Sequence, residues 1–196
     1  SGRSCSRGGH FYCRDGGATE MNAVEFCALA QGRGINPFAA TCQSALETGW
    51  WTSRLWLEAY NGAGLKAPWG WKGETLTVPS EECVGGRYKL KFSAFRKYPS
   101  PAAFLDDYAA KIKADYPESW ESADNWPGYF AGLFRGRWGS WATDQAYLDK
   151  LVGMAVRLGP ELLGDGWKGR MRLAVNLALQ RGSLERWQEE AIDKCV

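Results

Sequence analysis

Glu47 is the residue whose type and position point most clearly to chemistry. It lies in the segment 45–51, which reads ALETGWW, where a helical pattern ends at Gly49. The negative end of the helix dipole disfavours an ionised carboxylate there, and the two tryptophans that follow would exclude water from it. Both effects raise the pKa of a carboxyl group, and a carboxylic acid protonated near neutral pH is what a glycosidase needs as general acid. The alternative is an ordinary surface glutamate at a helix end.

The helix that must position Glu47 is predicted over residues 37–48. Asn36 can act as its N-cap, and Pro37 fits the first helical position, where a missing N–H costs nothing. Apolar residues recur at helical spacing on one face, and Gly49 ends the pattern. We therefore expect Glu47 in the last turn of a mostly buried helix.

The rest of the chain is mostly helical in pattern, with one exception. Further helices are predicted over residues 19–31 with Thr19 as cap, from Thr52 or Ser53 to 60, over 101–116, from 143–144 to about 155, and over 167–180 and 184–192. Two alternating segments, 75–78 and 88–92, predict a β-hairpin with an acidic tip. Residues 119–141 predict only short helical turns. This order indicates an α+β domain of lysozyme-like proportions with a small β-hairpin lobe.

The chain divides into three parts in this interpretation. Residues 1–18 form an irregular cysteine-containing arm, in which His10 is expected to be a surface residue. Residues 19–158 form the lysozyme-like domain. Pro160 opens a C-terminal helical extension, residues 159–196, which we expect to pack on the same domain.

Composition narrows the class of protein. A net charge of +2 over 196 residues is too weak to argue for nucleic acid, though it suits approach to an anionic polymer. The eleven tryptophans exceed ordinary usage, and each either fills the core or stacks on a sugar ring. No apolar run is long enough to span a membrane. No signal peptide is recognisable, so we expect a mature or trimmed form.

The cysteines favour disulfides over metal binding. The six of them lack CxxC spacing and the chain has one histidine, so no metal or other cofactor is expected. An even number spread along the chain suggests disulfides and an oxidising compartment, the alternative being six reduced cysteines. The one local pairing suggested is Cys27 with Cys42, across a helix hairpin. The six are Cys5, Cys13, Cys27, Cys42, Cys83 and Cys195.

Five motifs in order carry a resemblance to a known family. They are ALETGW at 45–50, YNGAGLKA at 60–67, FRKYPS at 95–100, the pair Asp107-Tyr108, and ATD at 142–144 followed by Tyr147 and Lys150-Leu151. Together they resemble the bacterial peptidoglycan-cleaving N-acetylglucosaminidases of the flagellar and autolysin type, glycoside hydrolase family 73. The resemblance covers about residues 24–156, and the arm and everything after residue 159 lie outside it.

The resemblance implies three catalytic candidates. The general acid of the family falls on Glu47. Its second acidic residue lies in the hairpin lobe and is best matched by Glu82, with Glu81 adjacent and Glu74 a weaker match. The Asp of the Asp-Tyr pair falls on Asp107, at the edge of an apolar helical stripe where it could face a cleft. The alternative for Asp107 is a solvated helix acid.

The same resemblance suggests which side chains contact the sugar. The substrate-binding candidates are Tyr60, Asn61, Trp69, Tyr108, Trp141 and Tyr147, with Trp71 and Trp138 as further groove residues. The family usually has Tyr where this chain has Trp141, and Pro where it has Gln145. Trp can stack on a sugar but supplies no phenolic hydroxyl, unless Tyr108, Tyr129 or Tyr147 takes that place.

The implied reaction is hydrolysis of the β-1,4 bond between N-acetylglucosamine and N-acetylmuramic acid in peptidoglycan. Glu47 would protonate the leaving oxygen, while Glu82 would activate a water or stabilise positive charge at the anomeric carbon. Alternatively the acetamido group of the sugar acts as nucleophile, and Glu82 or Asp107 orients it. One rival is a muramidase or lytic transglycosylase on the same fold, and another is a non-catalytic wall-binding module.

The biological setting is less specific. We expect a secreted or periplasmic monomer that acts on peptidoglycan glycan strands, with no nucleic-acid partner and no membrane insertion. An autolysin, a phage enzyme and an antibacterial toxin all fit. A toxin would require a cognate inhibitor or immunity protein that plugs the cleft.

Overall fold

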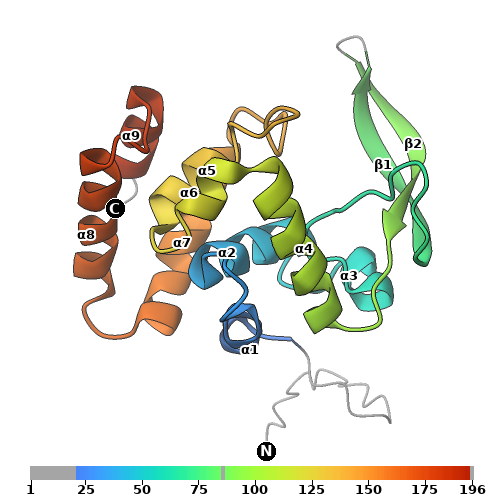
Figure 1. The fold of residues 1–196 in the computed structure, drawn as a ribbon, viewed down its shortest axis with the longest axis horizontal. Helices are drawn as coiled ribbons and strands as arrows, with labels where there is room; N and C mark the ends of the chain where they lie inside the picture. Colours follow the sequence, from blue (N-terminus) through green and yellow to red (C-terminus); the bar gives the residue numbers. More distant parts are fainter. Residues whose placement is uncertain (1–20, 85–86, 195–196) are drawn as a thin grey trace, which may run out of the picture.

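The computed structural model describes residues 21–84 and 87–194, apart from the side chains of residues 80–84 and 87–90 (Figure 1). The predicted arm, with His10, Cys5 and Cys13, lies outside the described residues, as do Thr19 and Cys195. In order, the elements are α1 (Ala23–Ala30), α2 (Pro37–Thr48), α3 (Arg54–Ala59), β1 (Thr75–Val84), β2 (Arg87–Arg96), α4 (Pro101–Asp115), α5 (Pro117–Glu121), α6 (Trp126–Gly132), α7 (Tyr147–Leu163), α8 (Trp167–Gln180) and α9 (Arg186–Asp193).

Helix α2 has the bounds that the sequence predicts. The Asn36 side chain accepts a hydrogen bond from the backbone N–H of Ala39 at 2.8 Å, and Pro37 occupies the first turn. The C-cap is Gly49, in the left-handed conformation. Most of the helix is buried, because α1, α6 and α7 pack around it. This gives Glu47, in its last turn, a rigid support.

A single aromatic-rich core surrounds α2. Helices α1, α4, α6 and α7 contribute its largest completely buried side chains, among them Phe26, Phe104, Tyr108, Tyr129 and Leu148. Helix α1 is shorter than predicted, because Asn22 caps it by accepting from the N–H of Glu25 at 2.9 Å. The residues predicted as short helical turns form α5 and α6.

The β-hairpin projects from the helical body, beside α3 and α4 (Figure 1). Its strands pair antiparallel from Thr75 opposite Arg96 to Val84 opposite Arg87, so the ladder is longer than predicted. Residues 81 and 82, expected in a loop tip, lie within β1. Residues 65–67 add a third segment at the base, where the N–H of Ala67 donates to Ala94 O and that of Arg96 to Leu65 O, both at 2.9 Å.

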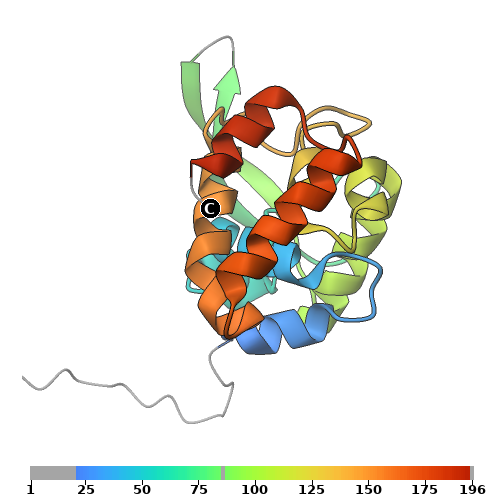
Figure 2. The same ribbon diagram turned by 90° about the vertical axis from the view of Figure 1, so that its left-hand side faces the viewer.

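Helices α8 and α9 cover one side of the body (Figure 2). Pro160 lies inside α7, which continues to Leu163, so it opens no new segment, and the predicted boundary at residues 158/159 falls within that helix. Arg135, after α6, donates to the carbonyl of Ser183 at 2.8 Å, and Arg181 pairs with Asp124 at 2.8 Å. Among the helices that the structure describes, none combines the length and apolarity needed to cross a membrane.

The predicted Cys27–Cys42 disulfide is wrong, because both thiols are free. The two residues lie on the packed helices α1 and α2, but a disulfide also requires a narrow range of Cα separation and Cβ direction. Cys42 is completely buried, and burial raises the pKa of its thiol. The other four cysteines fall outside the described side chains.

Candidate active site

Glu47 is positioned by an unusual turn that follows α2. Gly49, Trp50 and Trp51 all have positive φ angles, of 56°, 64° and 58°. Such a run is unfavourable for tryptophan and must be held by its surroundings. Trp51 holds it: its side chain is buried, and its indole N–H donates to the Ser44 hydroxyl at 3.0 Å. The Trp50 ring faces the Arg157 guanidinium at 4.2 Å from the ring centroid.

The carboxyl group of Glu47 has the electrostatic character expected of a general acid. Removal of water by surrounding protein raises its pKa from the ordinary value of 4.5, while hydrogen bonds from Tyr147 and Trp141 act in the opposite direction. The hydroxyl of Tyr147 donates to Oε1 at 2.7 Å. By its accessible surface, however, Glu47 as a whole is an exposed residue. One side of the carboxyl therefore lies against protein, and the other is open to a substrate.

A buried chain of hydrogen bonds leads from Glu47 into the core. Tyr147 accepts from Nε2 of Gln43 at 3.0 Å, and Oε1 of Gln43 accepts from the hydroxyl of Tyr108 at 2.5 Å. The hydroxyls of Tyr108 and Tyr129 lie 2.9 Å apart. Burial raises the pKa of all three tyrosines, so they stay protonated and can donate. Of the three tyrosines considered as sources of a phenolic hydroxyl, Tyr147 is the one bonded to Glu47.

A groove of about 350 Å³ lies beside Glu47, because a Cβ on the lining residue Gly64 would be 4.0 Å from Glu47 Oε2. It is lined by Ala63, Gly64, Leu65, Lys66, Pro68, Arg96, Lys111, Tyr116 and Trp141. Trp141 connects the groove to the acid, because it also hydrogen-bonds to Glu47. Its ring packs against Tyr108 and Tyr116, with centroids 5.8 and 5.2 Å away. The lining includes three cationic side chains, Lys66, Arg96 and Lys111, of which Arg96 and Lys111 are ion-paired with Asp107 and Asp115.

Three of the predicted sugar contacts, Asn61, Tyr108 and Tyr147, are buried inside the protein, which argues against direct contact with a sugar. Asn61 is completely buried: its amide donates to the carbonyls of Leu65 and Arg96 at 2.9 and 2.8 Å, and its oxygen accepts from the Leu65 N–H at 2.8 Å. Tyr108 is also buried and belongs to the hydrogen-bonded chain. The side chains of Asn61 and Tyr108 support the groove from inside the protein and are absent from its lining. Gly62 serves the same loop, since a Cβ there would lie 2.6 Å from Ser44 Oγ.

Asp107 joins α4 to the hairpin. Its Oδ2 accepts from the Arg96 guanidinium and from the Tyr98 hydroxyl, both at 2.6 Å. Arg96 also donates to the carbonyl of Lys66 at 3.2 Å and stacks over the Trp71 ring, 4.7 Å from its centroid. These contacts make Asp107 the anchor of the hairpin base. A direct part of Asp107 in the reaction stays a prediction.

The second carboxylate stays a prediction too. Glu82 lies in β1 opposite Lys89, with Glu81 before it, and neither side chain is among those described. Glu74, the weaker contender, pairs with Lys97 at 2.8 Å, and this lysine lowers the pKa of its carboxyl group. That contact ties Glu74 to the hairpin base.

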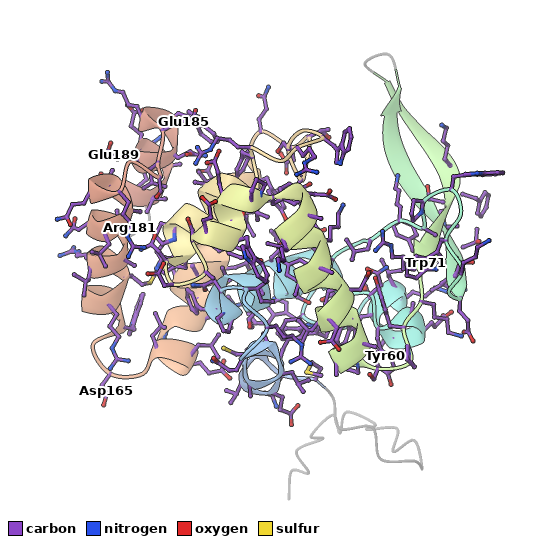
Figure 3. All side chains as sticks on the ribbon, viewed as in Figure 1. Tyr60, Trp71, Asp165, Arg181, Glu185 and Glu189 are labelled. Carbon is purple, nitrogen blue, oxygen red and sulfur yellow. The ribbon has the colours of Figure 1, made fainter. Side chains whose placement is uncertain are left out.

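The remaining aromatic candidates lie around the groove and on the surface. Trp69 and Trp138 are almost fully exposed, with relative exposures of 104% and 84%. Tyr60 is half-buried at the end of α3, where its ring packs edge-on to Trp56, while Trp71 lies beside the hairpin base (Figure 3). The exposed rings are free to stack on sugars, whereas Tyr60 is a part of the fold.

Gln43 and Arg96 are the functional neighbours that the sequence interpretation missed. Gln43 precedes Glu47 by four residues on the same helix, a spacing that places both side chains on one face and could have identified it. Arg96 belongs to the motif at 95–100, but its partner Asp107 could not be assigned from spacing. Within the described part of the chain, no three His, Cys, Asp or Glu side chains gather to hold a metal ion.

Comparison with known proteins identifies the family. A family model described as "Glucosaminidase: Mannosyl-glycoprotein endo-beta-N-acetylglucosaminidase" matches residues 24–159. The peptidoglycan hydrolase FlgJ of Salmonella typhimurium is 30% identical over 131 residues, which cover 64% of this chain and 40% of FlgJ. The exo-glucosaminidase LytG of Bacillus subtilis is 29% identical over 122 residues, covering 60% of this chain and 42% of LytG. The chain thus spans about two fifths of the length of these relatives.

A solved structure agrees with these matches. The catalytic domain of the autolysin Auto from Listeria monocytogenes superimposes with a TM-score of 0.57 and 25% identity, over 73% of this chain and 82% of that domain. The similarity confirms the predicted lysozyme-like α+β fold. The family match covers more than half of the chain and includes all five motifs. The resemblance is therefore confirmed: the chain belongs to the glucosaminidase family.

Proposed function

We propose that this chain hydrolyses peptidoglycan as an endo-β-N-acetylglucosaminidase, cleaving the β-1,4 bond between N-acetylglucosamine and N-acetylmuramic acid. The observation that carries the proposal is the carboxyl group of Glu47, whose pKa is raised by burial at the edge of a groove. Relatives named as a peptidoglycan hydrolase and a glucosaminidase support the substrate and the sugar.

Glu47 acts as the general acid in this mechanism. Its proton passes to the bridging oxygen as the bond to the anomeric carbon breaks, so the leaving sugar departs as a neutral alcohol. The hydroxyl of Tyr147 and the indole of Trp141 then stabilise the carboxylate that remains. The raised pKa keeps the acid form populated to higher pH than in an ordinary glutamate, and the two donors stabilise the ionised product.

The positive charge that develops at the anomeric carbon needs a second group. We propose Glu82, or Glu81 beside it, because both lie on β1, whose first residue pairs with Arg96 in the lining of the groove. Alternatively the acetamido oxygen of the substrate attacks, and a carboxylate only orients it. Asp107 supports either course by anchoring the hairpin to α4.

The lining of the groove suits the substrate. Peptidoglycan carries carboxylates on its stem peptides, and three basic residues line the groove: Lys66, and Arg96 and Lys111, which also pair with Asp107 and Asp115. Trp141 offers an aromatic surface for a sugar ring. We expect a monomer that meets its substrate in the periplasm or outside the cell, and a cognate inhibitor would have to cover this groove.

Analysis of the new chain ends tests the proposal. Purified peptidoglycan is digested with the protein, the products are reduced with borohydride, and the reduced sugar is identified by mass spectrometry. Reduced N-acetylglucosamine on fragments of many lengths supports an endo-glucosaminidase. Release of single terminal sugars would indicate an exo-enzyme. Reduced N-acetylmuramic acid would indicate a muramidase, and an anhydro end would indicate a lytic transglycosylase. An absence of products would indicate a wall-binding module. Each of these results overturns the proposal.

A further inference from the structure

Gln43 is the only side chain described here that connects the core tyrosines to the hydroxyl that contacts Glu47. It lies on α2, one turn before Glu47, and is completely buried. Its two polar atoms contact different partners: Nε2 donates to Tyr147 at 3.0 Å, and Oε1 accepts from Tyr108 at 2.5 Å. Turning the amide over would reverse both bonds, and the completely buried Tyr129 hydroxyl would then accept from Tyr108 and lose the acceptor that the Tyr108 oxygen provides for its own proton.

The chemistry of the amide gives this chain of hydrogen bonds one direction. The nitrogen of Gln43 can only donate, so the oxygen of Tyr147 accepts and its proton is left for Oε1 of Glu47, 2.7 Å away. The amide oxygen can only accept, so the Tyr108 hydroxyl donates to it. The Tyr108 oxygen then accepts the hydrogen bond that the Tyr129 hydroxyl donates. Every hydroxyl proton in the chain therefore points towards Glu47.

The direction of these hydrogen bonds fixes a donor on one of the two carboxyl oxygens of Glu47. Tyr147 donates to Oε1 at 2.7 Å, whereas Oε2 faces the loop at Gly64, where a Cβ would lie 4.0 Å from it. Gly64 lines the groove. The oxygen that Tyr147 does not contact is therefore the one on the side of the groove.

We propose that Gln43 is a positioning residue for catalysis, which keeps the hydroxyl of Tyr147 donating to Oε1 of Glu47 and so holds the carboxyl group with Oε2 towards the groove at Gly64. The catalytic part of this inference rests on the proposed function, whereas the direction of the chain does not. Gln43 touches no substrate and acts only through Tyr147.

The test is a titration of the Glu47 carboxyl carbon by NMR in ¹³C-labelled protein, with Glu47→Gln identifying the signal. Gln43→Met keeps the length of the side chain and removes both hydrogen bonds. Tyr147 is then free to turn away, so ionised Glu47 loses its donor and titrates about half a pH unit higher. Tyr147→Phe shifts the titration in the same direction. Adding Gln43→Met to Tyr147→Phe produces no further shift, because Gln43 acts through that hydroxyl.

Thr41→Val is the matched control. Thr41 is completely buried on the same helix, and its hydroxyl donates to the carbonyl of Pro37, outside the chain. This variant should lose stability without moving the titration of Glu47. The inference is overturned if Gln43→Met leaves the titration unchanged, or shifts it equally with and without the Tyr147 hydroxyl. Since no substrate is needed, a wild-type protein that hydrolyses nothing would contradict the proposed function and leave this result standing.

A second variant tests whether the substrate approaches Glu47 from the side of Gly64. Gly64→Asn adds a side chain beside Oε2, and Asn tolerates the φ of 61° found there. It should lower kcat/KM at least tenfold, because the new side chain lies between Oε2 and the groove. Gly32→Asn is its control, because Gly32 has a φ of 74° and a Cβ there meets nothing within 4 Å. Wild-type turnover by Gly64→Asn would overturn the orientation of Oε2 towards the substrate.

Discussion

Asp107 and Arg96 form an ion pair, with 2.6 Å between Oδ2 and Nη1, that joins α4 to the last residue of β2. The Tyr98 hydroxyl donates to the same carboxylate oxygen at 2.6 Å. Arg96 in turn contacts the Lys66 carbonyl and the Trp71 ring at the hairpin base. One carboxylate therefore holds the lobe that carries Glu81 and Glu82 against the helical body.

Breaking this pair from either end should have the same effect. Both side chains are partly buried, so we predict that Asp107→Asn and Arg96→Met each lower the free energy of unfolding by about 1–2 kcal/mol. Each should also lower kcat by loosening the hairpin. Urea denaturation and turnover on peptidoglycan measure both effects.

The double variant separates anchoring from chemistry. If Asp107 acts only as an anchor, Asp107→Asn combined with Arg96→Met is no worse than either change alone. Loss of activity in Asp107→Asn that Arg96→Met does not reproduce would make Asp107 a catalytic residue. Arg54→Met, which breaks the exposed Arg54–Glu58 pair, is the control and should leave stability nearly unchanged.

Asn61→Ala should destabilise the protein rather than weaken sugar binding. The Asn61 side chain makes three hydrogen bonds to backbone groups of Leu65 and Arg96, so we predict a loss of about 3 kcal/mol in the free energy of unfolding. Asn22→Ala, which removes an exposed helix cap, should cost about 1 kcal/mol. A raised KM for Asn61→Ala with unchanged stability would instead make Asn61 a substrate contact.

Tyr147→Phe should extend activity to higher pH. The Tyr147 hydroxyl stabilises the ionised form of Glu47, so its removal raises the pKa of that carboxyl group further. The alkaline limb of kcat/KM, which reports loss of the general acid, should move up by about half to one pH unit. In Tyr129→Phe, at the far end of the chain, the limb should move less. A limb that moves to lower pH would contradict the assignment of Tyr147 as donor.

Glu47→Gln should stabilise the protein in a pH-dependent way. The pKa of Glu47 is higher in the folded state than its ordinary value of 4.5. Below pH 4.5 the carboxyl group is protonated in both the folded and the unfolded state and costs no stability. As pH rises, the unfolded state ionises first, so the free energy of unfolding falls until the folded state is ionised too. Glutamine escapes this loss. The difference in Tm between Glu47→Gln and wild type should be smallest near pH 4, grow as pH rises above it, and level off once Glu47 is ionised in the folded state. A difference that is constant across this range would argue against a desolvated carboxyl.

Local signals made α2 and its acid predictable. Asn36, Pro37 and Gly49 specify both helix ends by capping chemistry, and the structure agrees. The hairpin was predicted but too short, because residues 79–84 lack strand alternation and are paired by the ladder itself. Pro160 was interpreted as a break, yet the tertiary packing of α7 continues the helix through it.

Contacts between distant residues were beyond prediction. Gln43 meets Tyr147 across 104 positions and Tyr108 across 65, and no local pattern records such pairs. The motifs marked Asn61 and Tyr108 as part of the site, but they could not tell a residue that supports the groove from one that lines it. That distinction depends on burial, which appears only when the helices are packed.

Digestion of purified peptidoglycan by wild type and by Glu47→Gln, followed by mass spectrometry of the reduced products, tests the role of Glu47 most directly. Glutamine keeps the shape of the side chain and its contact with Tyr147, but has no proton to transfer. We predict fragments ending in reduced N-acetylglucosamine from the wild type, and at least a hundredfold slower release from the folded variant. Wild-type rates from Glu47→Gln would contradict Glu47 as the general acid.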